Sequence, residues 1–140
     1  MIRLTSLPAA PIATVKASDP RRLILIVDDN TDHIEFLRLA LGSRFRVLSA
    51  TDGLLAYEVA CRERPDAILL DLMMPIADGP TLMRALGANP DTRTIPIVIV
   101  TAFDADVLGP LPPGVSVMLR KPCHQGEILD ALDQVLPSVA

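Results

Sequence analysis

The feature that most restricts the fold of this chain is a set of short, wholly apolar segments, several of which stop abruptly at a polar residue. In the segment "LILIVDDN", five apolar residues are followed directly by Asp28, Asp29 and Asn30. A strand that is apolar on both faces belongs in a parallel sheet covered by helices on each side. Two adjacent carboxylates at its end make each other costlier to ionise. The segment therefore predicts an α/β fold that gathers charge at one end of a buried strand.

Four further segments have strand character, and the stretches between them have the apolar spacing of helices. The additional strands are expected at Phe45–Ala50, Asp66–Asp71, Ile95–Thr101 and Gly114–Leu119. Helices are expected from Thr31 to Gly42, from Asp52 to Pro65, from Pro80 to Asn89 and from Gln125 to Leu136. An intervening fourth helix, over 102–109, is expected to be short or partly unwound because Pro110, Pro112 and Pro113 cannot continue it. Alternation of strand and helix, with right-handed crossovers, favours a flavodoxin-like, doubly wound sheet of five parallel strands in the order 2-1-3-4-5.

Length and proline content indicate how the chain is organised. A chain of 140 residues is most simply one domain. Residues 1–21 contain Pro8, Pro11 and Pro20 and have no continuous apolar core, so they are interpreted as a flexible tail rather than a signal peptide. The domain is expected over residues 22–137, with no output domain after it.

Composition excludes several classes of function. Half of the residues are hydrophobic but only 3% are aromatic, so the core must be aliphatic. The net charge of -4 argues against a nucleic-acid partner, which would need a basic face. No apolar run approaches the ~20 residues of a membrane span. Cys61 and Cys123 are interpreted as small buried hydrophobic side chains in a reducing compartment, so a cytoplasmic protein is expected.

The polar residues that interrupt the apolar segments are all expected at one edge of the sheet. Asp28 and Asp29 end the first strand, Asp71 the third and Thr101 the fourth, while Lys121 follows the fifth. In open α/β sheets the functional crevice lies beyond the carboxyl ends of the strands. Taken one at a time, the acid pair could equally cap a helix and the lysine could be an ordinary surface residue. Their convergence on a single edge is what predicts a site.

Three converging carboxylates need a cation, and Mg²⁺ is the one that prefers oxygen ligands. Lys121 adds a positive charge opposite the acids, and it is the only lysine after Lys16 among the thirteen basic residues. These groups suit phosphoryl transfer, which depends on positioning and on neutralising spread negative charge. Asp71, on the central strand, is the best candidate for a carboxylate nucleophile that forms an aspartyl phosphate. Neither His33 nor His124 has a ligand-spaced companion, and His33 is interpreted as a residue of a solvated helix face.

The motifs resemble those of the response-regulator receiver domains of two-component signalling. "VDDN" is similar to the acid pair of that family, "LLDLMMPIADG" to its phosphoacceptor segment, "IVIVTA" to its hydroxyl strand and "LRKP" to its lysine-proline turn. The resemblance covers roughly residues 22–136. It implies a stand-alone receiver that is not an enzyme, takes its phosphoryl group from a sensor histidine kinase or histidine phosphotransfer protein, and acts by docking on a downstream protein target. The sequence leaves a homodimer open.

The resemblance also assigns roles to individual residues. Asp71 would be the phosphoacceptor; Asp29, Asp71 and the carbonyl of Met73 would bind Mg²⁺, with Asp28 acting through a water. Thr101, the adjoining Ala102 and Lys121 would contact the phosphoryl oxygens, and the peptide bond before Pro122 would be cis. Met118 stands at the switch position, where the family usually has Phe or Tyr.

Three alternatives remain open from the sequence. A haloacid-dehalogenase-type phosphatase also uses an aspartate at a strand end, but it needs a second acid two residues later, where this chain has Met73. A pseudo-receiver would be an interaction module with this fold that is not controlled by phosphorylation. On a smaller scale, Cys123 and His124 could form a low-pKa thiol pair, although an unreactive, partly buried cysteine is the expected alternative.

Overall fold

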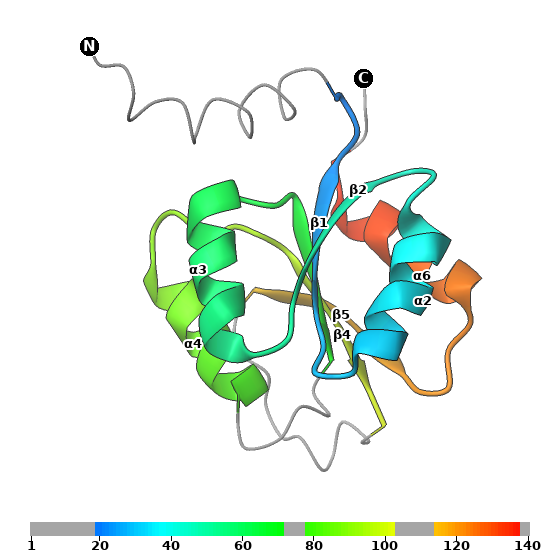
Figure 1. The fold of residues 1–140 in the computed structure, drawn as a ribbon. Coiled ribbons are helices and arrows are strands. Elements are labelled where there is room, and N and C mark those ends of the chain that lie inside the picture. Colours follow the sequence, from blue (N-terminus) through cyan, green and yellow to red (C-terminus); the bar gives the residue numbers. More distant parts are fainter. Residues whose placement is uncertain (1–18, 72–77, 103–113, 138–140) are drawn as a thin grey trace.

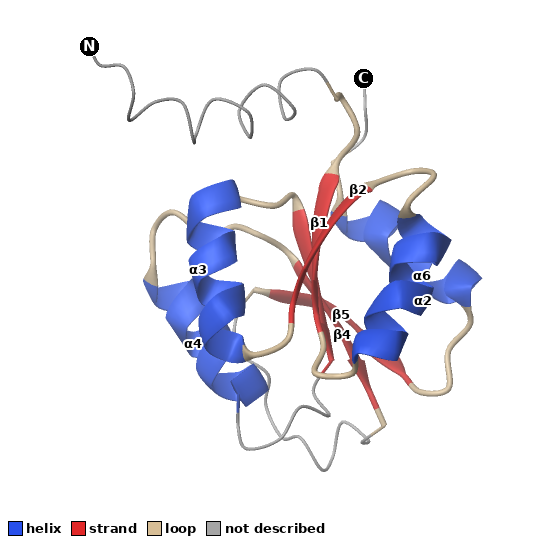
Figure 2. Cartoon of the chain, viewed as in Figure 1, coloured by secondary structure: helices blue, strands red, loops and turns tan. Residues whose placement is uncertain are grey.

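The computed structural model describes residues 19–71, 78–102 and 114–137. Their strands form one parallel sheet in the order β2-β1-β3-β4-β5, so the expected topology is confirmed (Figures 1 and 2). The strands are β1 (Leu23–Val27), β2 (Arg46–Ala50), β3 (Ala67–Asp71), β4 (Ile97–Thr101) and β5 (Val115–Arg120).

Helices cover both faces of this sheet. They are α2 (Thr31–Leu41), α3 (Gly53–Glu63), α4 (Asp78–Ala88) and α6 (Gln125–Val135). Helices α2 and α6 lie on one face, and α3 and α4 lie on the other (Figure 1). Residues 103–113, which contain most of the expected short fourth helix, and residues 1–18 of the expected tail lie outside the described residues.

The core explains why the central strands are apolar on both faces. Strands β1, β3 and β4 are buried along their whole length. Alternate residues of β1 enter separate clusters: Leu25 and Val27 pack with α3 and α4, whereas Ile24 and Ile26 pack with α2 and α6. Successive side chains of a strand point to opposite faces, so a strand between two helical layers must be apolar at every position.

Side-chain hydrogen bonds cap the first turns of α2 and α3. The side chain of Asn30 accepts hydrogen bonds from the backbone N–H groups of Asp32 (2.9 Å) and His33 (3.1 Å), and so caps the start of α2. Asp52 caps α3 in the same way, through the N–H of Leu55 at 2.8 Å. Helix α2 ends at Gly42, whose φ of -66° is helical rather than left-handed. These two caps set where each helix starts relative to the strand before it.

The first and last described residues meet at the end of the sheet opposite the carboxyl ends of the strands (Figure 1). The guanidinium of Arg22 donates to the carbonyl of Pro137 at 3.2 Å, and Arg44 forms an ion pair with Asp133 at 2.6 Å. Among the described residues, no helix is long and apolar enough to cross a membrane.

Candidate functional site

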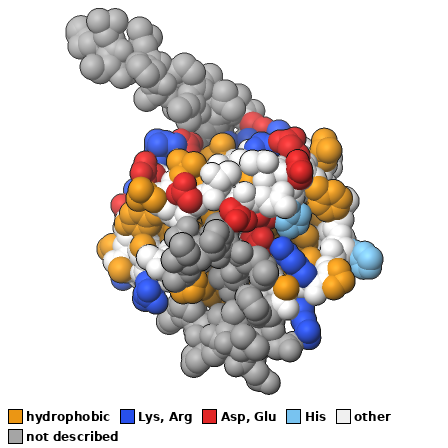
Figure 3. Space-filling view, turned by 60° about the horizontal axis from the view of Figure 1, so that its bottom comes forward, with side chains coloured by type: hydrophobic (Ala, Val, Ile, Leu, Met, Phe, Trp, Pro, Cys, Tyr) orange, Lys and Arg blue, Asp and Glu red, His pale blue; other side chains and the backbone are white. Residues whose placement is uncertain are grey.

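The carboxyl ends of the parallel strands bring the predicted polar residues to one face of the molecule. Asp28 follows β1, Asp71 ends β3, Thr101 ends β4 and Lys121 follows β5. Figure 3 looks toward this end and shows acidic side chains near the centre of the face, with a histidine and basic side chains beside them. The site is therefore assembled from strands that are far apart in sequence and adjacent in the sheet.

Asp71 and Lys121 form the central ion pair. The Nζ of Lys121 donates to Oδ2 of Asp71 at 3.1 Å, across the end of β4. The side chain of Asp71 is 7% exposed and that of Lys121 is 29% exposed. The N–H of Lys121 also donates to the carbonyl of Thr101 at 2.7 Å, which fixes the backbone from which the lysine reaches the acid.

Asp28 is the second buried acid of the site, at 1% exposure. Its Oδ1 accepts the N–H of Asn30 at 2.9 Å, and its Oδ2 contacts Nδ1 of His33. Burial raises the pKa of Asp28, and the negative charge of Asp71 raises it further; the hydrogen bonds from Asn30 and His33 act in the opposite direction. Keeping this carboxylate ionised therefore costs stability unless a cation is near.

His33 belongs to this site, so its interpretation as a residue of a solvated helix face was wrong. Single ligand atoms of Asp28, His33 and Asp71 all lie within 4.8 Å of one another, and His33 is half-buried. The imidazole comes from the first turn of α2, which Asn30 caps directly after the acid pair. His33 was missed from the sequence because metal ligands were sought close together in the chain. Its companions Asp28 and Asp71 come instead from the ends of two different strands.

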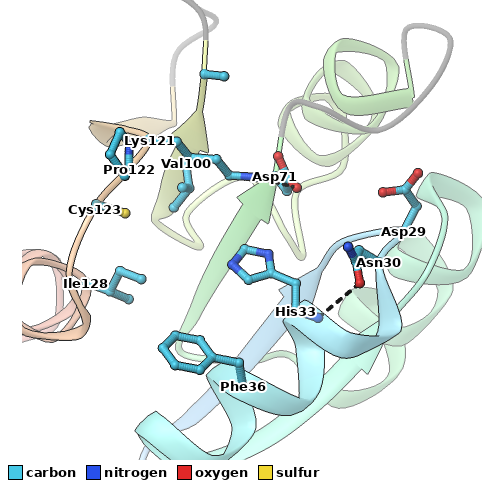
Figure 4. Close-up of a pocket in the computed structure, with 11 residues that line it drawn as sticks. Asp29, Asn30, His33, Phe36, Asp71, Val100, Lys121, Pro122, Cys123 and Ile128 are labelled. Atoms are coloured by element: carbon cyan, nitrogen blue, oxygen red, sulfur yellow. Dashed lines mark hydrogen bonds and ion pairs between the residues drawn. The ribbon is translucent and has the colours of Figure 1, made fainter.

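Asp29 occupies a different position from its neighbour. It is exposed at the mouth of the site, and Figure 4 shows its carboxylate standing apart from Asp71. Both acids follow the last residue of β1, and one of them joins the buried cluster with His33 and Asp71. In this structure that member is Asp28, whereas the resemblance placed Asp29 in direct contact with the metal.

The remaining expected residues are placed as follows. Thr101 is fully buried at the end of β4, and Ala102 is exposed and lines the cavity beside Asp71. The peptide bond between Lys121 and Pro122 is cis, the conformation expected from the resemblance. Met118 is half-buried against the core on the α3 and α4 side of the sheet and pairs with Ile99. Met73 lies outside the described residues.

These residues surround a cavity of about 590 Å³. Figure 4 shows Asp71, Lys121 and His33 at its polar end, whereas Phe36 from α2 and Ile128 from α6 form an apolar end. Phe36 is 53% exposed, which is unusual for a large aromatic side chain. Asp29, Asp71 and Lys121 thus face an open space large enough for a phosphoryl group and the side chain that carries it.

Cys123 also lines this cavity, and both cysteines are free. Burial raises the pKa of its thiol, and the charge of Glu127 raises it further, while Lys121 acts in the opposite direction. The thiol is therefore a poor nucleophile at neutral pH. The expected unreactive, partly buried cysteine is supported over a low-pKa pair with His124.

The family model of the response regulator receiver domain matches residues 24–133 of the chain. The chain belongs to the response regulator receiver family. Apart from Leu23, the described strands, the buried acids and the lysine after β5 all fall within this match. Receiver domains are the signalling modules of two-component systems, and the general class predicted from the sequence is confirmed.

Relatives within the family include proteins much longer than this chain. The response regulator PleD of Caulobacter vibrioides is 43% identical over 102 residues, which are 71% of this chain and 22% of that protein. The sensor histidine kinase TmoS of Ectopseudomonas mendocina is 36% identical over 93 residues, which are 66% of this chain and 9% of that protein. The chain thus spans less than a quarter of these relatives.

Solved structures agree with the fold along nearly all of the domain. The receiver domain of the sensor histidine kinase PA1611 from Pseudomonas aeruginosa has 32% identity and a TM-score of 0.76, over 84% of this chain and 99% of that one. That structure holds a magnesium ion coordinated in its active-site cleft. A sensor protein from Polaromonas gives the same identity and TM-score over 83% of this chain and 96% of that one.

Proposed function

We propose that Asp71 accepts a phosphoryl group from a sensor histidine kinase or a histidine phosphotransfer protein, in a reaction that requires Mg²⁺. The phosphorylated domain then signals by docking on a downstream protein, in the cytoplasm and without a catalytic output of its own. The observation that carries this proposal is the ion pair between Asp71 and Lys121 beside the buried Asp28, at the open end of the sheet.

The donor atoms of the site suit a hard divalent cation. Asp28 and Asp71 present carboxylate oxygens within a few ångströms of each other, and Asp29 lies at the mouth of the same cavity. Oxygen is the ligand atom that Mg²⁺ prefers, and one or two carboxylates plus a phosphate oxygen and waters complete its coordination. Burial raises the pKa of Asp28, and the nearby negative charge of Asp71 raises it further, so a cation at this point would favour the ionised carboxylate. When bound, Mg²⁺ would neutralise the carboxylates and the phosphoryl oxygens.

Different residues of the site would supply the nucleophile and the groups that stabilise charge during phosphoryl transfer. A carboxylate oxygen of Asp71 attacks the phosphorus, the bond from phosphorus to the donor nitrogen breaks, and an acyl phosphate forms on Asp71. Lys121, already at hydrogen-bond distance from Asp71, then faces the phosphoryl oxygens and stabilises their charge. Thr101 and Ala102, at the end of β4, would contact the same group.

The test uses purified protein, Mg²⁺ and acetyl phosphate as a small donor. Intact-mass spectrometry should show the addition of one phosphoryl group to the wild-type chain, lost on treatment with hydroxylamine. Asp71→Asn should abolish the addition, because an amide cannot act as the nucleophile. Asp66→Asn is a matched control, since Asp66 lies at the other end of β3 and its side chain accepts the N–H of Leu23.

Two results would contradict the proposal. Phosphorylation of Asp71→Asn at the wild-type level would place the phosphoacceptor elsewhere. Absence of phosphorylation in the wild-type chain, with both acetyl phosphate and a panel of histidine kinases, would favour a pseudo-receiver that acts only by binding.

A further inference from the structure

His33 is a potential metal ligand of the site that neither magnesium binding nor phosphoryl transfer requires. Its side chain leaves the first turn of α2 and enters the cavity between Asp71 and Phe36 (Figure 4). Its Nδ1 contacts Oδ2 of the buried Asp28. A histidine on an exposed helix face would instead point to water, as His124 does at the start of α6.

The spacing of the cluster is compatible with three ligands of one ion. The ligand atoms of Asp28, His33 and Asp71 all lie within 4.8 Å of one another. Two atoms that each lie about 2.1 Å from a metal are separated by roughly 3 Å when adjacent and roughly 4 Å when opposite. The spread of up to 4.8 Å among the three atoms is only slightly larger than these separations.

The chemistry of the third ligand changes which ions the cluster prefers. Carboxylates and water suit Mg²⁺, whereas imidazole suits zinc, copper, iron and nickel. Two carboxylates with one imidazole therefore form a mixed oxygen and nitrogen set, which favours borderline transition metals more strongly than an all-oxygen site does. Among the described residues this is the only group of three such side chains close enough to hold an ion.

We propose that His33 is a nitrogen ligand and that the cluster of Asp28, His33 and Asp71 binds a divalent transition metal of the nickel and zinc class. This inference rests on the proposed function in one respect: Asp28 and Asp71 are also the carboxylates proposed to bind Mg²⁺. A bound transition metal would occupy the position of Mg²⁺, so the two classes of ion would compete for the site.

The experiment compares Ni²⁺ and Mg²⁺ as probes, by isothermal titration calorimetry of tag-free protein near neutral pH. His33→Ala should weaken Ni²⁺ binding at least tenfold, the lower limit seen when even an outer partner of a metal ligand is lost. The same variant should change the Mg²⁺ dissociation constant by less than about threefold, because the oxygen ligands remain. Circular dichroism establishes that the variant is folded.

Two control variants remove a nitrogen ligand and a sulfur ligand that the proposal does not use. His124→Asn takes away the only other imidazole and keeps a residue that favours the start of α6. Cys123→Ser takes away the thiol that lines the same cavity. Both should bind Ni²⁺ as the wild-type chain does. Loss of Ni²⁺ affinity in either control, with full affinity in His33→Ala, would overturn the proposal.

The outcome for His33→Ala separates a ligand from a positioning residue. An equal loss of Ni²⁺ and Mg²⁺ affinity would overturn the proposal, because it would show that His33 only orients Asp28. Competition completes the test: Ni²⁺ should displace Mg²⁺ from the wild-type chain and do so less effectively from His33→Ala. Mg²⁺-dependent phosphorylation of Asp71 is measured separately, so a failure of this inference leaves the proposed function standing, and the reverse also holds.

Discussion

The ammonium group of Lys121 lies 3.1 Å from a carboxylate oxygen of Asp71, although the two residues are 50 positions apart in the chain. The pair bridges the end of β4, because β3 and β5 are its two neighbours in the sheet. The carboxylate is nearly buried, and the ammonium group of Lys121 offsets part of its charge. This arrangement places a fixed positive charge where negative charge would gather on phosphorylation.

Lys121→Met should slow phosphorylation of Asp71 by acetyl phosphate by about 100-fold, the effect typical of losing one group that stabilises a developing anion. Hydrolysis of the aspartyl phosphate should slow as well, because the lysine faces the same oxygens in that reaction. Time courses of intact mass give both rates. Arg120→Met is the control, because this exposed neighbour ends β5 and should leave both rates near the wild-type values. Wild-type rates for Lys121→Met would show that the ion pair is only structural.

Asp28→Asn should stabilise the metal-free chain and weaken the stabilisation by Mg²⁺. Burial raises the pKa of Asp28, so the folded chain holds this proton more tightly than the unfolded chain does. The resulting penalty is absent below the ordinary carboxyl pKa of about 4 and complete once the pH exceeds the raised value. Near pH 7, with a chelator present to remove metal ions, the variant should melt a few degrees higher than the wild type. This shift corresponds to roughly 1 kcal/mol in the free energy of unfolding.

The pH dependence of that difference checks its cause. The advantage of Asp28→Asn in melting temperature should shrink as the pH falls through the raised pKa and vanish below about pH 4, where the wild-type carboxyl group becomes protonated in both states. Added Mg²⁺ should raise the melting temperature of the wild type more than that of the variant, through linkage of binding to folding. An advantage that stays constant with pH would mean that packing, not charge, explains it.

Gly42→Ala and Gly87→Ala should change stability in opposite directions. A Cβ at Gly42 would lie 2.8 Å from the carbonyl oxygen of Arg38, so the end of α2 would have to move. Destabilisation by about 1 to 3 kcal/mol is expected, as for other overpacked sites. A Cβ at Gly87 in α4 would meet nothing within 4 Å, and alanine there should stabilise the helix by up to about 1 kcal/mol. Urea unfolding of both variants, at equal Mg²⁺, measures the difference.

Much of the fold could be predicted from the sequence because the strands carry a simple signal. Residues 23–27 are buried without exception, and only a strand between two helical layers requires that pattern. The parallel order of the sheet then places Asp71 and Lys121 at the same edge. The expected ends of the strands were accurate to within one or two residues. Residues 95 and 96, expected in the fourth strand, precede β4.

The details of the site could not be predicted in the same way, because they depend on which side each residue takes at the end of a strand. The sequence indicates that Asp28 and Asp29 lie near Asp71, but only the end of β1 decides that Asp28 is the buried member. His33 enters the site because Asn30 caps α2 directly after the acid pair, which places His33 in the first helical turn. An asparagine directly after the acid pair was the available signal, since it is a favoured N-cap.

Cys123 should react slowly with iodoacetamide, although it lines the cavity. Burial and the charge of Glu127 raise the pKa of its thiol, so the reactive thiolate is scarce at neutral pH and the rate should still be rising near pH 9. Peptide mapping by mass spectrometry measures its alkylation separately from that of Cys61. Glu127→Gln should speed the reaction modestly, because it removes a negative charge but keeps an acceptor for the N–H of His124. A rate at neutral pH above that of free cysteine would restore the alternative of a low-pKa pair with His124.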